Sequence, residues 1–260
     1  MYDDIGADYD RFVNWPSRLE AELPLIEREL EAIGARRIMD AACGTGMHAI
    51  ALAQRGYQVA AADLSAGMVE QGQANAAAAG VDIDFRVAGF GELAEQASQQ
   101  FDAVLCLGNS LPHVLTPEGL RCTLEDFAAC LRPDGLLLVQ NRNFDAVLSE
   151  RDRWMAPQAY REPGTEWLFL RFYDFEPDGR LAFNLVTLRR EDGGQWHQRA
   201  GSTRLWPLRQ EELKMALNAV GFVEISLWGD MAGAPLDPDL SPNLVAGARK
   251  QSGSTGGQRA

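Results

Sequence analysis

Apolar and polar positions along the chain follow two different periods. Short apolar runs cover residues 38–39, 57–62, 84–88, 101–107 and 136–140. Apolar residues at helical spacing predict helices over 19–33, 68–79, 120–131 and 211–220. Apolar runs that alternate with helices are typical of a parallel sheet covered on both faces. The pattern therefore predicts an α/β fold with a doubly wound sheet, and two final strands at 222–227 and 244–248.

Residues 150–206 break this alternation. Apolar and polar residues alternate with a period of two over 166–175, 180–190 and 195–205. Pro177-Asp178-Gly179 and Asp192-Gly193-Gly194 lie between these segments and are typical of turns. We therefore expect an inserted antiparallel sheet, which serves either as a lid over a substrate or as a contact between subunits.

These patterns divide the chain into four parts. Residues 1–36 form an N-terminal helical segment, 37–149 and 207–250 form the core, and 150–206 form the insertion. The last residues, 251–260, are rich in Gly and Ser, so we expect a disordered tail there.

The first apolar run leads into Asp40-Ala41-Ala42-Cys43-Gly44-Thr45-Gly46, and a helical pattern follows. Glycine allows the backbone of such a strand–turn–helix to approach a ligand closely, because it has no Cβ and tolerates positive φ angles. Asp63 ends the second apolar run, where a carboxylate can accept hydrogen bonds from both hydroxyls of a ribose. The third glycine of the nicotinamide motif is missing, which makes a pyrophosphate-binding loop the weaker interpretation.

Together with Asp63-Leu64-Ser65-Ala66-Gly67-Met68, this motif resembles the cofactor motifs of class I S-adenosylmethionine-dependent methyltransferases. The resemblance implies a Rossmann-like sheet of seven strands whose last two strands are antiparallel, and S-adenosylmethionine as the cofactor, with S-adenosylhomocysteine as its product. The implied cofactor residues are Asp40, Ala42, Gly44, Gly46, Asp63, Leu64, Met68, Gly89, Phe90, Leu107 and His113. Gly89 departs from the family, which commonly has Asp or Asn there to receive the adenine amino group. A glycine turn in some other α/β protein is the alternative, and Met68 could equally be a core residue.

Three further segments resemble the glycine and sarcosine N-methyltransferases. They are Asn14-Trp15-Pro16-Ser17-Arg18, the run from Cys106 to His113, and Arg142-Asn143-Phe144-Asp145. The resemblance implies that Arg18 binds the carboxylate of the cofactor's methionine moiety, that Asn109 orients the acceptor and that Arg142 binds the acceptor's carboxylate. A planar guanidinium suits this last task because it donates two parallel hydrogen bonds. The simpler alternatives are solvated arginines at 18 and 142 and a loop or capping histidine at 113.

Methyl transfer to nitrogen requires an aligned and unprotonated amine. We therefore expect Arg142 to anchor the acceptor's carboxylate and Asn109 to orient its amine. Backbone carbonyls or a tyrosine of the N-terminal segment, Tyr9 or Tyr2, would help to desolvate that amine. Glycine or sarcosine is the preferred acceptor. The alternative is an amino sugar or another natural-product acceptor, methylated on nitrogen or oxygen, because Trp206 stands where relatives can have a tyrosine. A cofactor-binding scaffold without activity and a nicotinamide oxidoreductase are the remaining hypotheses.

Charge and composition narrow the partners. A formal net charge of -13 over 260 residues disfavours a surface that follows nucleic-acid phosphates. The four cysteines lack metal-ligand spacing, so we expect no metal. No apolar run approaches the ~20 residues of a membrane span, and the acidic N-terminus does not resemble a signal peptide. We therefore expect a cytoplasmic enzyme for a small molecule, as a monomer or homodimer.

Overall fold

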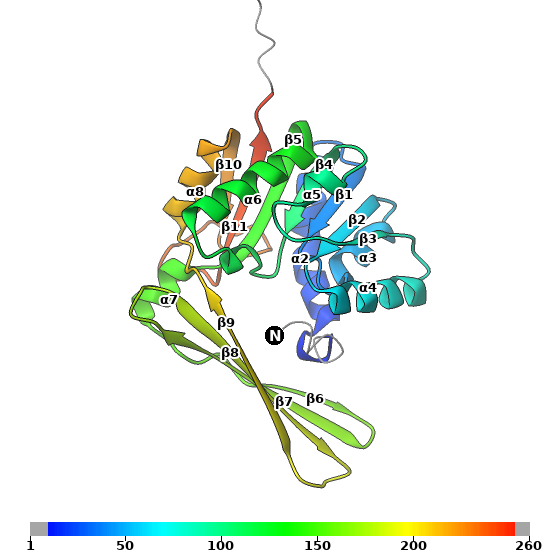
Figure 1. Cartoon of the computed structure of the whole chain (residues 1–260), viewed down its shortest axis with the longest axis vertical. Helices are drawn as coiled ribbons and strands as arrows, with labels where there is room; N and C mark the ends of the chain where they lie inside the picture. The colour runs from blue at the N-terminus through cyan, green and yellow to red at the C-terminus, as the bar shows by residue number, and fades with distance from the viewer. Residues whose placement is uncertain (1–9, 253–260) are drawn as a thin grey trace, which may run out of the picture.

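A computed structural model describes residues 10–252 and contains two separate sheets (Figure 1). The larger sheet has seven strands in the order β10-β11-β5-β4-β1-β2-β3. Its strands are β1 (Arg37–Ala41), β2 (Gln58–Asp63), β3 (Asp84–Val87), β4 (Phe101–Cys106), β5 (Leu131–Arg142), β10 (Phe222–Trp228) and β11 (Asn243–Lys250). Strands β1 to β5 pair in parallel, whereas β11 is antiparallel to both β5 and β10. The predicted α/β fold with a seven-stranded sheet is confirmed.

Helices cover both faces of the large sheet because alternate residues of its strands point to opposite sides. Ile38 of β1 packs in one apolar cluster with α2 (Trp15–Glu31) and α3 (Met47–Ala53). The neighbouring Met39 packs in another cluster with α5 (Leu93–Gln96), α6 (Pro117–Cys130) and α8 (Gln210–Ala219). The remaining helical elements are α4 (Ala66–Ala79), the 3₁₀ turn η2 (Leu111–His113) and α7 (Phe144–Glu150). Burial on both faces explains why these strands appear in the sequence as continuous apolar runs.

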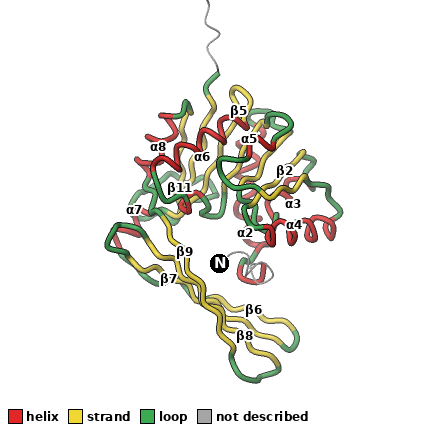
Figure 2. The backbone as a smooth tube through the Cα atoms, viewed as in Figure 1, coloured by secondary structure: helices red, strands yellow, loops and turns green. Residues whose placement is uncertain are grey.

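The second sheet confirms the inserted antiparallel sheet and adds a strand to it. Its order is β6-β7-β8-β9, and it extends away from the larger sheet as a long twisted arm (Figure 2). The strands are β6 (Gln158–Glu162), β7 (Thr165–Phe175), β8 (Leu181–Glu191) and β9 (His197–Leu205). Strand β6 was not predicted because most of its residues are exposed, which leaves no clear apolar alternation. The division of the chain into domains stays a prediction. Most of the predicted tail, residues 253–260, lies outside the described residues.

Two boundaries differ from the sequence prediction. Helix α2 begins at Trp15, with Pro16 inside its first turn. Proline is tolerated there because the N–H groups of the first turn have no partner within the helix, so its missing N–H loses no hydrogen bond. Strand β5 begins at Leu131, five residues before the apolar run at 136–140 from which it was predicted. The register against β4 shifts between Leu131 and Leu136, and Asp134 has a φ of 60°, so these residues form an irregularity inside the strand.

Two apolar clusters join the inserted sheet to the rest of the molecule. Met68 of α4 packs with Trp167, Phe169 and Leu185 of the insertion. In the second cluster, Phe144 of α7 packs with the insertion residues Tyr173, Leu181 and Leu205. The inserted sheet is thus attached beside both halves of the larger sheet, and it closes one side of the space above the strand ends.

Gly46 fixes the start of α3. Its φ is 77°, and a Cβ added there would lie 2.8 Å from Cζ of Phe85. Replacing Gly46 with Ala should therefore lower the free energy of unfolding by about 2–4 kcal/mol, through backbone strain and a steric clash. Denaturant unfolding measures this change.

Gly80 provides the matched control, because its φ is 69° and no atom lies within 4 Å of an added Cβ. Gly80→Ala should show the backbone cost alone, about 1 kcal/mol. Equal losses in the two variants would contradict the role given to Phe85.

Candidate functional site

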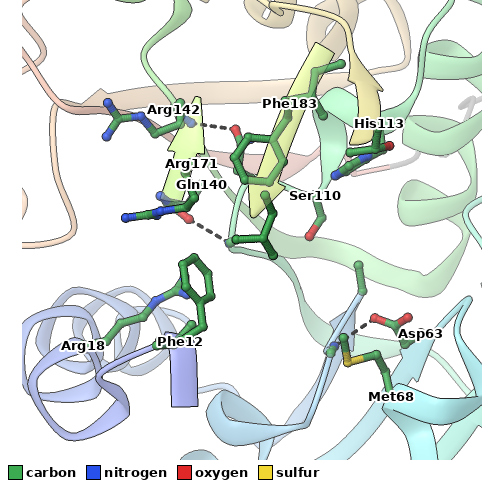
Figure 3. Close-up of a pocket in the computed structure, with 18 of the residues that line it drawn as sticks. Phe12, Arg18, Asp63, Met68, Ser110, His113, Gln140, Arg142, Arg171 and Phe183 are labelled. Atoms are coloured by element: carbon green, nitrogen blue, oxygen red, sulfur yellow. Dashed lines mark hydrogen bonds between the residues drawn. The ribbon is translucent and has the colours of Figure 1, made fainter. Parts of the chain in front are cut away.

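A cavity of about 1330 Å³ lies at the carboxyl ends of the parallel strands, between α2 and the inserted sheet (Figure 3). It exceeds the roughly 300–1,000 Å³ of a typical site for one ligand, so it has room for a cofactor and an acceptor together. Most of the residues predicted from sequence line it. They are Arg18, Ala42, Gly44, Asp63, Leu64, Met68, Gly89, Phe90, Asn109, His113 and Arg142.

The tips of β1 and β2 are joined by the carboxylate of Asp63. Its Oδ2 accepts a hydrogen bond of 2.9 Å from the N–H of Gly44, and its Oδ1 accepts one of 2.9 Å from the N–H of Ser65. Ser65 in turn caps α4, since its hydroxyl accepts from the N–H of Met68. The glycine turn and the start of α4 are therefore held to one carboxylate that lines the cavity.

Three predicted cofactor residues do not line the cavity. Gly46 is buried, and its conformation serves the helix start and the ring of Phe85. Leu107 is buried in the apolar cluster beneath the strand ends. Asp40 is 2% exposed, and its Oδ2 has no hydrogen-bond partner among residues 10–252. The cofactor role assigned to these three residues stays a prediction.

Burial raises the pKa of Asp40 to about 6, and the nearby charge of Asp63 adds to this rise, against the opposing influence of His48. An ionised carboxylate in this position is disfavoured because burial removes it from water. Asp40 is therefore a buried acid that titrates close to neutral pH.

One end of the cavity is apolar with a carboxylate at its edge. Leu64 is 76% exposed and lines the cavity, and Phe90 lies beside it with its ring edge-on to Phe127 at 5.4 Å between centroids. Glu92 was missed by the sequence analysis. Its Oε2 accepts from the N–H of Gly89 at 3.0 Å and it lines the cavity, which puts a carboxylate next to the position where the side chain of residue 89 is absent.

Arg18 lies at the side of the cavity formed by α2. Its Nε donates to Oε1 of Glu22 at 3.0 Å, and the other oxygen of Glu22 is 2.6 Å from Nε2 of His48. The guanidinium also lies over the ring of Trp15, with 5.1 Å between Cζ and the ring centroid. Arg18 is therefore held by its own helix and by α3, rather than solvated as in the simpler alternative.

The loop after β4 is held to the ends of β5 and β11 by side-chain amides. Oε1 of Gln140 accepts from the N–H of Gly108 at 2.7 Å, and its Nε2 donates to Asn243 at 3.0 Å. Asn109 has a φ of 66°, and its Oδ1 accepts from the N–H of Arg142 at 2.9 Å. This last bond leaves the NH₂ of Asn109 as its remaining hydrogen-bonding group. Gln140 and Asn243 gave no signal in the sequence, because their partners are distant in the chain.

The inserted sheet contributes Arg171 and Tyr173 to the cavity, and neither was predicted. Burial raises the pKa of Tyr173, against the charges of Arg142 and Arg171 and a hydrogen bond with Arg142. The phenol is therefore protonated at neutral pH, and it lies close to both guanidinium groups. The alternating pattern of β7 predicted a strand but did not show which of its faces meets the core.

Of the two remaining predicted site residues, His113 is described by the structure and Tyr9 is not. His113 lines the cavity, and burial lowers its pKa to about 4, so its ring is neutral at physiological pH. Tyr9 and Tyr2 lie outside the described residues, and their proposed role stays a prediction. Within residues 10–252 there is no cluster of three or more metal-ligating side chains and no helix long and apolar enough to cross a membrane.

Comparisons with known proteins agree with this arrangement. A methyltransferase-domain family model matches residues 38–135. The chain is 30% identical over 224 residues to a glycine/sarcosine N-methyltransferase of Aphanothece halophytica. The aligned region covers 85% of this chain and 79% of that protein.

Two solved structures share the fold. One is an S-adenosylmethionine-dependent methyltransferase from Clostridium acetobutylicum, with a TM-score of 0.78 and 13% identity over 96% of this chain and 99% of that chain. The other is S-adenosylmethionine-bound CalS10, an amino pentose methyltransferase from Micromonospora echinaspora, with a TM-score of 0.73 and 21% identity over 94% of this chain and 95% of that chain.

The sheet order, the glycine turn and the carboxylate at the end of β2 are those of a class I S-adenosylmethionine-dependent methyltransferase. Within that class, the chain belongs to the glycine/sarcosine N-methyltransferase family. It is an enzyme that uses S-adenosylmethionine as its cofactor and acts on a small molecule.

The pKa of Asp40 leads to a prediction about stability. The folded protein binds a proton at Asp40 more tightly than the unfolded chain, because the pKa is about 6 rather than 3.8. Between these values stability falls as the pH rises, by about 3 kcal/mol for this group. Asp40→Asn has no group that titrates at this position, so it should not lose this stability. The difference in free energy of unfolding, variant minus wild type, should therefore rise between pH 4 and pH 8.

Denaturant unfolding at several pH values measures the difference. Asp40→Ala also lacks the titrating group and should show the same pH dependence, at a lower overall stability. A difference between wild type and Asp40→Asn that does not change with pH would contradict the prediction.

Proposed function

We propose that the enzyme methylates the nitrogen of a small amine that carries a carboxylate, such as glycine or sarcosine. The observation that supports this most directly is the guanidinium of Arg142. It lines the cavity, its Nε is buried without a hydrogen-bond partner, and it forms no ion pair with any carboxylate of residues 10–252. A half-buried cation without a protein anion is costly unless a ligand supplies the charge.

In this proposal the cofactor binds at the end of the cavity away from Arg142, where polar and apolar groups match its parts. Asp63 offers a carboxylate to the ribose hydroxyls, Leu64 and Phe90 offer apolar surface to the adenine, and Glu92 offers an acceptor for the adenine amino group in place of the missing side chain of Gly89. Arg18 binds the carboxylate of the methionine moiety. When bound, S-adenosylmethionine supplies an electrophilic methyl group on a positively charged sulfur.

The chain must also present the amine without its proton. An ordinary alkylammonium, with a pKa near 10, is neutral in only about one molecule in a thousand at pH 7. The NH₂ of Asn109 is a donor, so in this proposal it orients the acceptor's carboxylate while the enclosed cavity lowers the amine pKa by desolvation. Neutral His113 lines the same cavity and adds no positive charge that would compete with the ammonium.

Arg142→Ala tests the acceptor site. Loss of two charge-assisted hydrogen bonds should raise the KM for glycine by about 100-fold or more, since each contributes roughly 1.5–3 kcal/mol. Affinity for S-adenosylhomocysteine should change by less than about twofold. Steady-state kinetics and isothermal titration measure the two effects.

Arg121→Ala serves as the control, because Arg121 is an exposed residue of α6 paired with Glu125. It should leave both quantities as in the wild type. Unchanged kinetics with glycine in Arg142→Ala would contradict the assignment of the carboxylate to Arg142.

An amino sugar is the second candidate acceptor. The cavity volume of about 1330 Å³ favours it, because glycine occupies little of the space that remains beside a nucleoside. CalS10, which shares the fold, acts on an amino pentose. Sugars lack a carboxylate, so turnover of an amino sugar that survives Arg142→Ala, with no turnover of glycine by the wild type, would favour this candidate.

A further inference from the structure

Glu22 is a buried carboxylate that the proposed chemistry does not use directly. It is 9% exposed, lies one helical turn after Arg18 on α2, and binds two partners with its two oxygens. Oε1 accepts from Nε of Arg18 at 3.0 Å, and Oε2 accepts from Nε2 of His48 at 2.6 Å. Burial acts to raise the pKa of Glu22, but the hydrogen bonds and charges of His48 and Arg18 hold it below its ordinary value, so the carboxylate is ionised.

His48 connects this carboxylate to the glycine turn. It lies in the first turn of α3, two residues after Gly46, and is 5% exposed. The ring of Trp15 meets its ring edge-on, at 5.5 Å between centroids, and Arg18 lies over the same indole. Residues of α2 and α3 therefore form one buried unit around Glu22, although they are about thirty positions apart in the sequence.

The bond to Glu22 determines which atoms of Arg18 are available. Because Nε is engaged, the two terminal nitrogens remain for a ligand. A Cβ added at Gly108, at the end of β4, would lie 3.6 Å from Nη2 of Arg18. The guanidinium thus crosses the cavity from α2 toward the loop that follows β4, and Figure 3 shows it directed into the cavity.

We propose that Glu22 and His48 are positioning residues for cofactor binding, which aim the terminal nitrogens of Arg18 at the carboxylate of the cofactor's amino-acid moiety. An arginine has several rotatable bonds, and fixing it in advance removes an entropy cost that a bound ligand would otherwise bear. His48 completes the unit because it fixes the second oxygen of Glu22, so the carboxylate cannot turn away from Arg18. This inference rests on the proposed role of Arg18 and concerns the cofactor rather than the acceptor.

Two nucleosides separate positioning from a general structural role. S-adenosylhomocysteine carries the amino-acid carboxylate, whereas 5′-methylthioadenosine has the same nucleoside and sulfur but lacks both this carboxylate and the amino group. Glu22→Gln and His48→Ala in the full chain should weaken binding of S-adenosylhomocysteine by about tenfold or more, since charge-assisted hydrogen bonds have this magnitude. Binding of 5′-methylthioadenosine should change by less than about twofold. Isothermal titration measures both affinities.

Two further variants define the mechanism. His48→Gln keeps a hydrogen-bond donor for Glu22 and should recover part of the affinity that His48→Ala loses. In an Arg18→Ala background, Glu22→Gln should cause no additional loss, because it acts only through Arg18. Glu20→Gln changes an exposed carboxylate of the same helix and should bind both nucleosides as the wild type does.

The outcomes distinguish this inference from the proposal beneath it. Equal weakening of both nucleosides in Glu22→Gln and His48→Ala, or no weakening of either, would overturn the positioning role. A selective loss in Arg18→Ala without one in Glu22→Gln would overturn the positioning role and leave Arg18 in place. If Arg18→Ala itself is not selective, the role of Arg18 fails first, and the role of Glu22 fails with it.

Discussion

The hydrogen bond between the N–H of Gly44 and the carboxylate of Asp63 joins the ends of two parallel strands. The N–H of Cys43 also donates to the carbonyl of Ala62, so the turn after β1 is held to the end of β2 by a backbone bond as well as by this carboxylate. Here one carboxylate binds the glycine turn after β1 with one oxygen and the start of α4 with the other. The other residues that line the cavity, including those of α2 and of the loop after β4, surround these two joined strand ends.

Charges around the cavity are balanced by partners from different parts of the chain. Glu22 is shared between Arg18 and His48, and Asp63 accepts hydrogen bonds from two backbone N–H groups. Arg142 has no such carboxylate among residues 10–252, and Asp40 is kept protonated by burial up to a pH of about 6. A buried charge needs compensation, so Arg142 is a cavity charge that the carboxylate of a ligand can complete.

The inserted sheet brings further side chains to the cavity from outside the larger sheet. It is attached through Met68 at one end and Phe144 at the other, and it adds Arg171 and Tyr173 to a cavity whose cofactor end belongs to the larger sheet. The cavity is therefore lined from both units, by Asn109 and Arg142 of the larger sheet and its loops and by Arg171 and Tyr173 of the inserted sheet. Changes in β7 and β8 could alter the acceptor while the glycine turn and Asp63 stay the same.

The sequence by itself determined the α/β class, the positions of the strands other than β6, the inserted sheet, the family and eleven of the residues that line the cavity, including Asp63, Asn109 and Arg142. These features depend on local periods and short motifs, which a linear reading contains. Only the tertiary structure decided that Asp40, Gly46 and Leu107 lie beneath the cavity, that Glu92 stands beside Gly89, and that Glu22 joins Arg18 to His48. Burial and contacts between residues far apart in the chain depend on how helices and strands pack, and no local pattern encodes them.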